Sequence, residues 1–93
     1  MSDERRAVMQ AELNEFARRL REHREARGWT MTDLARAVWG DRMTERGLTV
    51  AANRERILVY EAAKSWPTPV NLTKIAAALE VTPEELGWPR AMR

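Results

Sequence analysis

Residues 16–35 of the chain, FARRLREHREARGWTMTDLA, decide how it folds. Phe16 and Leu20 are four residues apart, which places both on one face of a helix, and charged residues fill the other faces. Gly28 is expected to end that helix. Thr30 is a good N-cap, with Asp33 three residues later, so a second helix should begin directly after it. The stretch therefore predicts two helices joined by a tight turn.

The helical pattern continues on both sides of this stretch. Upstream, Met9 and Leu13 extend the apolar stripe of the first helix at alternating spacings of four and three residues. Downstream, Pro67 and Pro69 separate two further apolar segments, and Thr82 opens a capping box before a short last one. No segment alternates as a strand would. We expect one all-α, compact domain over residues 1–93, with helices at 5–27, 31–39, 53–64, 69–80 and 83–87. Thr49 and Asn53 are both acceptable N-caps, so a start of the third helix at Thr49 is the alternative to 53.

The segment 40–52 interrupts the helical pattern. It contains two glycines, four charged residues and only scattered apolar ones. A long loop between the second and third helices is therefore expected there.

The composition limits the possible functions. The chain has no cysteine, so no disulfide or thiolate metal site is available, and a reducing cytoplasm is the expected location. The first nine residues lack an apolar signal core, and the longest apolar run, Ile75–Leu79, is far too short for a membrane span. A net charge of +2 permits nucleic acid as a partner without requiring it.

The sequence offers little for catalysis. His23 is the single histidine, and neither a glycine-rich phosphate loop nor a metal-ligand spacing occurs. Glu84 and Glu85 follow Thr82 and Pro83 in a capping box, which explains them without chemistry. We therefore expect no enzyme activity, no cofactor and no metal.

Two blocks of the sequence share an ordered pattern with a known family. The residues that carry it are Arg24, Gly28, Thr30, Leu34 and Ala35 in the block from Phe16 to Ala35, and Ile57, Tyr60, Glu61, Pro67, Leu72, Lys74, Ile75, Ala76, Ala78, Leu79, Val81, Glu85 and Leu86 in the block that resumes at Asn53. This ordered set resembles the Cro/CI-like helix-turn-helix family, also called the xenobiotic-response-element family. Together the blocks cover most of the chain. The resemblance implies a five-helix, lambda-repressor-like DNA-binding domain with an extended first helix and an insertion between helices two and three.

The resemblance further implies a sequence-specific, double-stranded DNA-binding transcriptional regulator, which we expect to be a repressor. Its third helix, starting near Asn53, would lie in the major groove. Arg54 could then pair with guanine, Glu55 could accept from a cytosine amine, and Leu58 or Val59 could touch a thymine methyl. The predicted DNA-contacting residues are Thr30, Thr32, Arg42, Arg46, Asn53, Arg54, Glu55, Arg56, Leu58, Val59 and Lys64.

Other positions have structural roles or depart from the family. Arg24 and Glu61 take positions that the family commonly joins by an ion pair between the first and third helices. Met31 replaces the usual glutamine at the start of the second helix, and Trp39 replaces the turn glycine. An alanine pair at 62–63 replaces the polar residue and glycine that usually end the third helix, which is therefore expected to run on toward residues 64–65.

The expected partner is double-stranded DNA with an inverted-repeat operator, bound by a homodimer. Two interfaces are open: the apolar C-terminal tail with Trp88, Pro89 and Met92, and the first helix. The alternative function is a protein-binding adaptor or antitoxin that keeps the fold. We expect the protein to be cytoplasmic, bacterial or phage-encoded, nucleoid-associated when bound, and without a membrane partner.

Overall fold

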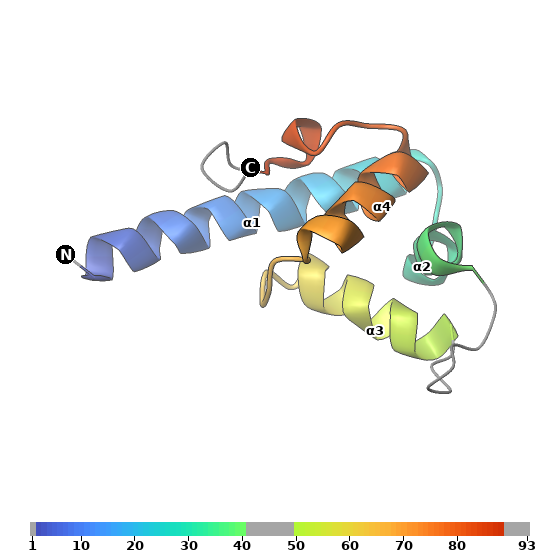
Figure 1. The fold of residues 1–93 in the computed structure, drawn as a ribbon, viewed down its shortest axis with the longest axis horizontal. Coiled ribbons are helices and arrows are strands. Elements are labelled where there is room, and N and C mark those ends of the chain that lie inside the picture. The colour runs from blue at the N-terminus through green and yellow to red at the C-terminus, as the bar shows by residue number, and fades with distance from the viewer. Residues whose placement is uncertain (1, 41–49, 89–93) are drawn as a thin grey trace.

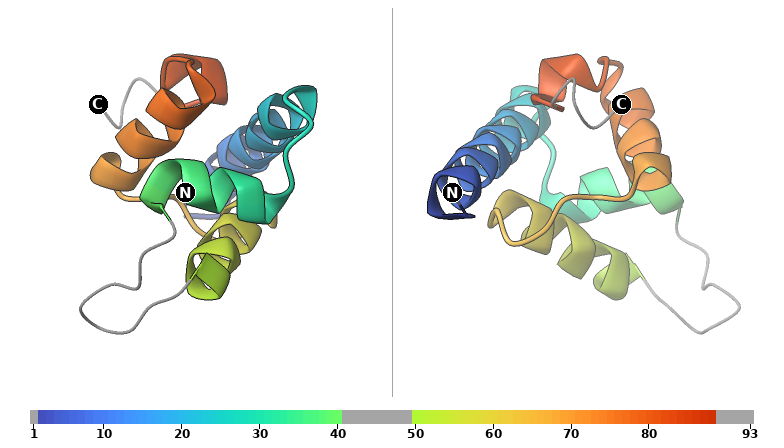
Figure 2. Two further views of the ribbon diagram at one scale, coloured as in Figure 1. Left: turned by 90° about the vertical axis from the view of Figure 1, so that its right-hand side faces the viewer. Right: turned by 60° about the vertical axis from the view of Figure 1, so that its left-hand side comes forward.

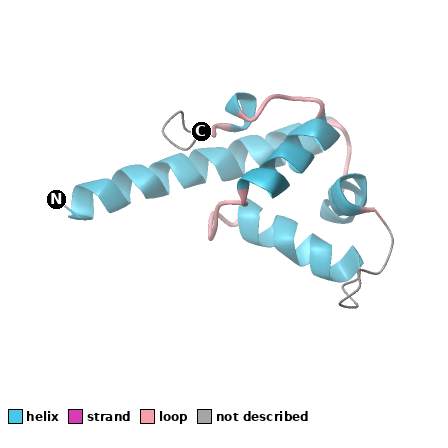
Figure 3. Ribbon diagram, in the orientation of Figure 1, coloured by secondary structure: helices cyan, strands magenta, loops and turns pink. Residues whose placement is uncertain are grey.

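Helices make up most of the chain in the computed structural model, which describes residues 2–40 and 50–88 (Figures 1 and 3). The elements are α1 (Ser2–Ala26), α2 (Met31–Trp39), α3 (Val50–Glu61), α4 (Pro69–Leu79) and the 3-10 turn η1 (Glu84–Leu86). Within the described ranges there is no strand. The predicted all-α class is thus confirmed.

The expectation of five α-helices is wrong, because the last element is a single 3-10 turn. Pro83 precedes η1, and Gly87 follows it in the left-handed conformation with a φ of 82°. The amide of Gly87 already turns back to the carbonyl of Glu84, at 2.9 Å. Only three residues remain between the proline and the glycine, too few to build an α-helix.

The junction of α1 and α2 follows the local chemistry of its residues. Gly28 has a φ of 69°, and the amide of Trp29 bonds back to the carbonyl of Arg24, which ends α1. The Thr30 hydroxyl accepts from the amide of Asp33 at 3.1 Å, and the Asp33 carboxylate accepts from the amide of Thr30 at 2.9 Å. This is the predicted capping box, and α2 has the predicted bounds.

The bounds 53–64 predicted for α3 are wrong at both ends, whereas the alternative start at Thr49 agrees with the observed one. The helix begins at Val50, so the expected loop 40–52 is shorter at its end, and residues 41–49 lie outside the described ranges. It ends at Glu61 because Ala63 adopts a φ of 56° and the amide of Lys64 bonds back to the carbonyl of Val59. Because α3 ends there, the chain turns and Trp66 packs against the core. A longer helix would prevent this contact.

The end of α4 is also one residue earlier than the predicted 69–80. The Thr68 hydroxyl accepts from the amide of Asn71, and Pro69 occupies the first turn, as its fixed φ allows. Glu80 is left-handed, with a φ of 57°, and closes the helix.

The core lies where the four helices meet. In the left-hand view of Figure 2, α1 and α4 form the upper level, α2 crosses in front of them and α3 lies below. The fully buried large side chains are Phe16, Leu20, Leu34, Ile57, Ile75, Leu79 and Leu86. No described helix is both long and apolar enough to cross a membrane.

An aromatic row joins the C-terminal segment to α1. The ring of Trp66 lies 5.2 Å from that of Phe16 and 5.4 Å from that of Trp88, the second contact being edge-to-face. Trp88 is therefore buried within its own chain rather than left for a partner. Pro89 and Met92, the other residues of the predicted tail interface, lie outside the described residues.

Candidate nucleic-acid interface

One face of α3 is buried and the other is exposed. Ile57 and Tyr60 lie in the core, as predicted, and Glu61 is buried beside them. Asn53 is also buried, at 2% exposure, although the sequence suggested it for contact with DNA. Because α3 starts three residues early, Asn53 lies one turn before Ile57 on the same inward face.

The exposed face begins with Arg54 and Glu55. Their side chains form a loose ion pair of 3.6 Å between Arg54 Nη1 and Glu55 Oε1, and both are well exposed. One turn later, Leu58 is 38% exposed, whereas Val59 is half-buried and packs against the core. Of the two apolar candidates, Leu58 is therefore the one available to a ligand.

Arg56 points toward the end of α2. Its guanidinium carbon lies 5.6 Å from the ring centroid of Trp39, within cation–π range. Trp39 stands where the resembled family has a glycine, so this contact depends on a departure from the family pattern. The stacking limits the freedom of a long, exposed cation.

Arg24 ties α3 to the rest of the domain. Its Nε and Nη2 donate to the two carboxylate oxygens of Glu61 at 2.7 and 2.9 Å, which confirms the predicted contact. Its Nη1 donates to the carbonyl of Trp29 at 2.8 Å. The Glu61 carboxylate raises the pKa of Arg24, so the guanidinium stays charged. One side chain thus joins α1, the α1–α2 turn and the end of α3.

Arg21 extends this network to the surface. Its Nε lies 3.9 Å from Glu61 Oε1, and its Nη2 donates to the Glu61 carbonyl at 3.5 Å. It lines a shallow hollow of about 220 Å³ together with Met31 and Leu58. Sequence reasoning missed Arg21, although its position three residues before Arg24 places both on neighbouring parts of α1.

The remaining predicted contact residues surround this face. Thr30 is exposed at the start of α2, where its hydroxyl oxygen accepts from the amide of Asp33. Hydrogen bonds from the backbone and side chain of Thr30 lower the pKa of Asp33. Thr32 is half-buried, and Lys64 is exposed just beyond α3. Arg42 and Arg46 lie outside the described residues.

The described residues hold no group of three histidine, cysteine or acidic side chains that could bind a metal ion. Three comparisons were made, with models of protein families, with curated proteins and with solved structures. None of them finds a match. The candidate interface therefore depends on the geometry of this chain alone.

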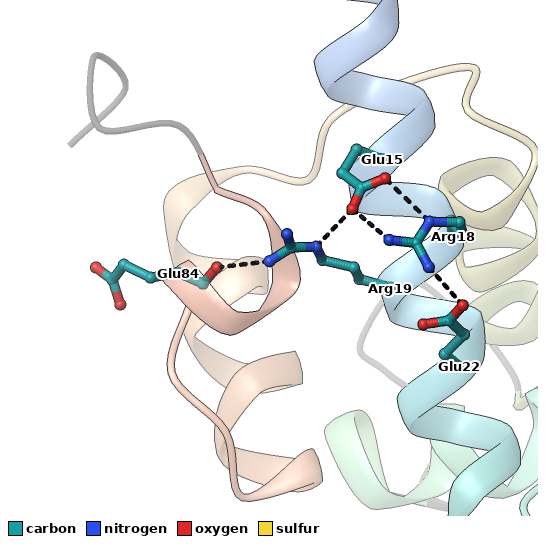
Figure 4. Close-up of polar contacts among 5 residues, drawn as sticks. All are labelled: Glu15, Arg18, Arg19, Glu22 and Glu84. Carbon is teal, nitrogen blue, oxygen red and sulfur yellow. Dashed lines mark hydrogen bonds and ion pairs between the residues drawn. The ribbon is translucent and has the colours of Figure 1, made fainter.

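The arginines on the outer face of α1 differ from those of α3. Figure 4 shows Arg18 between the carboxylates of Glu15 and Glu22, while Arg19 donates to Glu15 at 2.8 Å and to the Glu84 carbonyl at 3.5 Å. The two arginines lower the pKa of Glu15 to about 2. Their charge is thus met within the chain, which makes this face a poor candidate for binding an anion.

Proposed function

We propose that the protein is a sequence-specific, double-stranded DNA-binding transcriptional regulator that acts as a repressor, with the lambda-repressor-like fold of the Cro/CI-like helix-turn-helix family. One observation carries the proposal. α3 packs against α2 through one face and exposes Arg54, Glu55 and Leu58 on the other. A helix with its side chains is about 10–12 Å wide, which suits a major groove of about 12 Å.

In this proposal the exposed side chains of α3 read base edges. Arg54 donates two hydrogen bonds to O6 and N7 of a guanine, and Glu55 accepts one from a cytosine amine. Leu58, one turn after Arg54 on the same side of α3, contacts a thymine methyl. The loose Arg54–Glu55 ion pair supports this assignment. At 3.6 Å between two exposed side chains the pair is weak, so each side chain can leave the other and bond to a base at little cost.

The surrounding cations and hydroxyls contact phosphates and set the orientation of α3. Arg56 is held against Trp39, so little side-chain freedom is lost when it meets a phosphate. Lys64, exposed just beyond α3, supplies a further donor, and the exposed Thr30 hydroxyl lies at the start of α2. The Arg24–Glu61 contact fixes the position of α3 relative to α1. Accurate base contacts require such a fixed position.

The first experiment finds the site and tests Arg54. Binding sites are selected from a random pool of duplexes with the full chain, and affinities are measured for the selected site. Arg54→Ala should weaken that site by about 1–3 kcal/mol, or roughly 5- to 150-fold, and relax the preference at one base pair. Arg56→Ala should weaken all duplexes by a similar factor, because a phosphate contact carries no sequence information.

Arg18→Ala is the matched control, since Arg18 is an exposed arginine outside the candidate interface. It should leave both affinity and preference unchanged. Failure of the wild-type chain to select any sequence, or binding to duplex DNA that does not weaken with salt, would overturn the proposal. Such a result would favour the protein-binding adaptor.

A further inference from the structure

A shallow hollow lies beside the exposed face of α3, where α1, α2 and α3 meet. Its volume is about 220 Å³, and its lining consists of Arg21, Arg24, Met31, Leu58, Glu61 and Ala62. Leu58 belongs to the face of α3 that we assign to the bases, and Met31 is the first residue of α2. In a helix-turn-helix domain, the helix before the reading helix crosses the DNA backbone. The hollow therefore borders the backbone phosphates in the proposed complex.

Two of the charged side chains in the hollow satisfy each other. Arg24 donates from Nε and Nη2 to the carboxylate oxygens of Glu61, at 2.7 and 2.9 Å, and from Nη1 to the carbonyl of Trp29. The side chain of Arg24 is 11% exposed and that of Glu61 is 2% exposed. Arg24 could turn to a phosphate only by leaving the Glu61 carboxylate buried and unpaired, which is costly.

Arg21 is the other cation of the hollow, and its contacts are weak. Its side chain is 54% exposed, and its Nε lies 3.9 Å from Glu61 Oε1. Its Nη2 donates to the Glu61 carbonyl in a long hydrogen bond of 3.5 Å. Contacts of this kind between exposed groups contribute little to stability. They hold the guanidinium at the hollow, and because Arg24 already neutralises Glu61, the charge of Arg21 is in excess there.

We propose that Arg21 binds a backbone phosphate of the DNA at this hollow. The inference rests on the DNA-binding function proposed above, and it adds a contact from α1 to those from α2 and α3. A guanidinium presents its N–H groups in a planar fork that matches two phosphate oxygens. Met31, Leu58 and Ala62 carry no charge that would compete with the phosphate. Their apolar surface excludes water, which strengthens the attraction between the two charges.

The position of Arg21 complements that of Arg56. Arg56 stacks on Trp39, the last residue of α2, whereas the hollow beside Arg21 is lined by Met31, the first. These two ends of α2 are about 12 Å apart at 1.5 Å per residue. Two phosphate contacts at such a separation fix the direction of α2, and of α3 packed on it, whereas one contact would let the pair pivot.

Arg18 shows that exposure alone does not make such a site. It precedes Arg21 by one turn of α1, and its side chain is also 54% exposed. Its guanidinium lies between the carboxylates of Glu15 and Glu22, however, and bonds to both. A phosphate would have to displace these carboxylates. The two arginines thus differ in their partners and not in their exposure, which makes Arg18 the matched control.

The test measures the affinity of the full chain for the selected duplex over a range of salt concentrations. Each neutralised phosphate contributes about 0.9 to the steepness of log affinity against log salt. Arg21→Met should lower this steepness by about 0.9. The ratio of wild-type to variant affinity should therefore grow about 8-fold for each tenfold decrease in salt. The preference among sequences should stay unchanged, because a phosphate contact carries no sequence information.

Three further variants separate the charge of Arg21 from its other contacts. Arg21→Gln can still donate to the Glu61 carbonyl but is uncharged, so it should lower the steepness as Arg21→Met does. Arg21→Lys keeps the charge and should keep most of the steepness. Arg18→Met should keep all of it. Thermal melting of each variant shows whether it is folded.

Each other outcome counts against the phosphate contact. A relaxed sequence preference with unchanged steepness would mean that Arg21 only supports α3. An equal decrease for Arg18→Met would assign the effect to the general charge of α1. If the wild-type chain selects a site and folded Arg21→Met and Arg21→Gln keep its steepness, this contact alone is refuted. If the wild-type chain binds no duplex, the proposed function fails and the contact fails with it.

Discussion

Replacing Arg24 by methionine leaves the carboxylate of Glu61 buried without its closest cationic partner. The side chain of Glu61 is 2% exposed, and Arg24 supplies two hydrogen bonds to it. Breaking a buried ion pair typically costs about 3–5 kcal/mol, because one charge remains uncompensated. Arg21, whose Nε lies 3.9 Å from Glu61, can take over part of the role. We therefore expect a loss near the lower limit, about 3 kcal/mol.

Urea denaturation followed by circular dichroism measures this loss. A domain of this length has a total unfolding free energy of about 5–14 kcal/mol, so the variant should remain folded in the cold. Its melting temperature should fall by about 12–24 °C. Arg18→Met, on the exposed side of the same helix, is the matched control and should change stability little.

The double variant Arg24→Met with Glu61→Leu distinguishes the energy of the ion pair from the separate effects of losing each side chain. Because it removes both charges, it should be more stable than Arg24→Met alone. A loss of less than about 1 kcal/mol for Arg24→Met, or a double variant whose loss equals the sum of the two single losses, would refute the reasoning.

Two further predictions concern the ends and the outer face of helices. Ala63→Gly should raise the unfolding free energy by about 0.5–1 kcal/mol in urea denaturation, because glycine tolerates the φ of 56° found there. Ala62→Gly, one residue earlier, should lower the unfolding free energy. An increase in the unfolding free energy of Ala62→Gly would contradict the explanation. The pKa of Glu15 is lowered to about 2 from 4.5, so its stabilising contacts persist above pH 4.5 and vanish as the pH falls toward 2. The difference in melting temperature between wild type and Glu15→Gln should shrink over that interval, and a constant difference down to pH 2 would refute the assignment.

Two features of the candidate site were predicted, one from the local pattern of α3 and one from the family resemblance. Arg54 and Glu55 lie on the exposed side of α3, and Arg24 meets Glu61, as the resemblance suggested. The burial of Asn53 was not foreseen, because it depends on where α3 begins. Thr49 and Asn53 are both acceptable N-caps, and the local sequence does not distinguish the two starts.

Contacts between distant residues were beyond sequence reasoning for a different reason. The sequence shows Trp39 only as a departure from the resembled family, yet its ring lies under the guanidinium of Arg56. Trp88 was assigned to a tail, yet it packs on Trp66. Aromatic rings and arginines can each meet many partners, and only the path of the chain between them selects one.

Local sequence signals place the end of α1 to within one residue, at 27 against the observed Ala26, and place the starts of α2 and α4 correctly. Gly28, Thr30 and Thr68 act on backbone groups within a few residues, so their effects need no tertiary contact. Which part of the α1 stripe is covered depends instead on the packing of the whole chain. The pattern makes Met9 and Leu13 equivalent, but the body of the domain reaches Leu13 and stops short of Met9. Burial depends on how far the packed elements extend, which a periodic pattern along one helix does not encode.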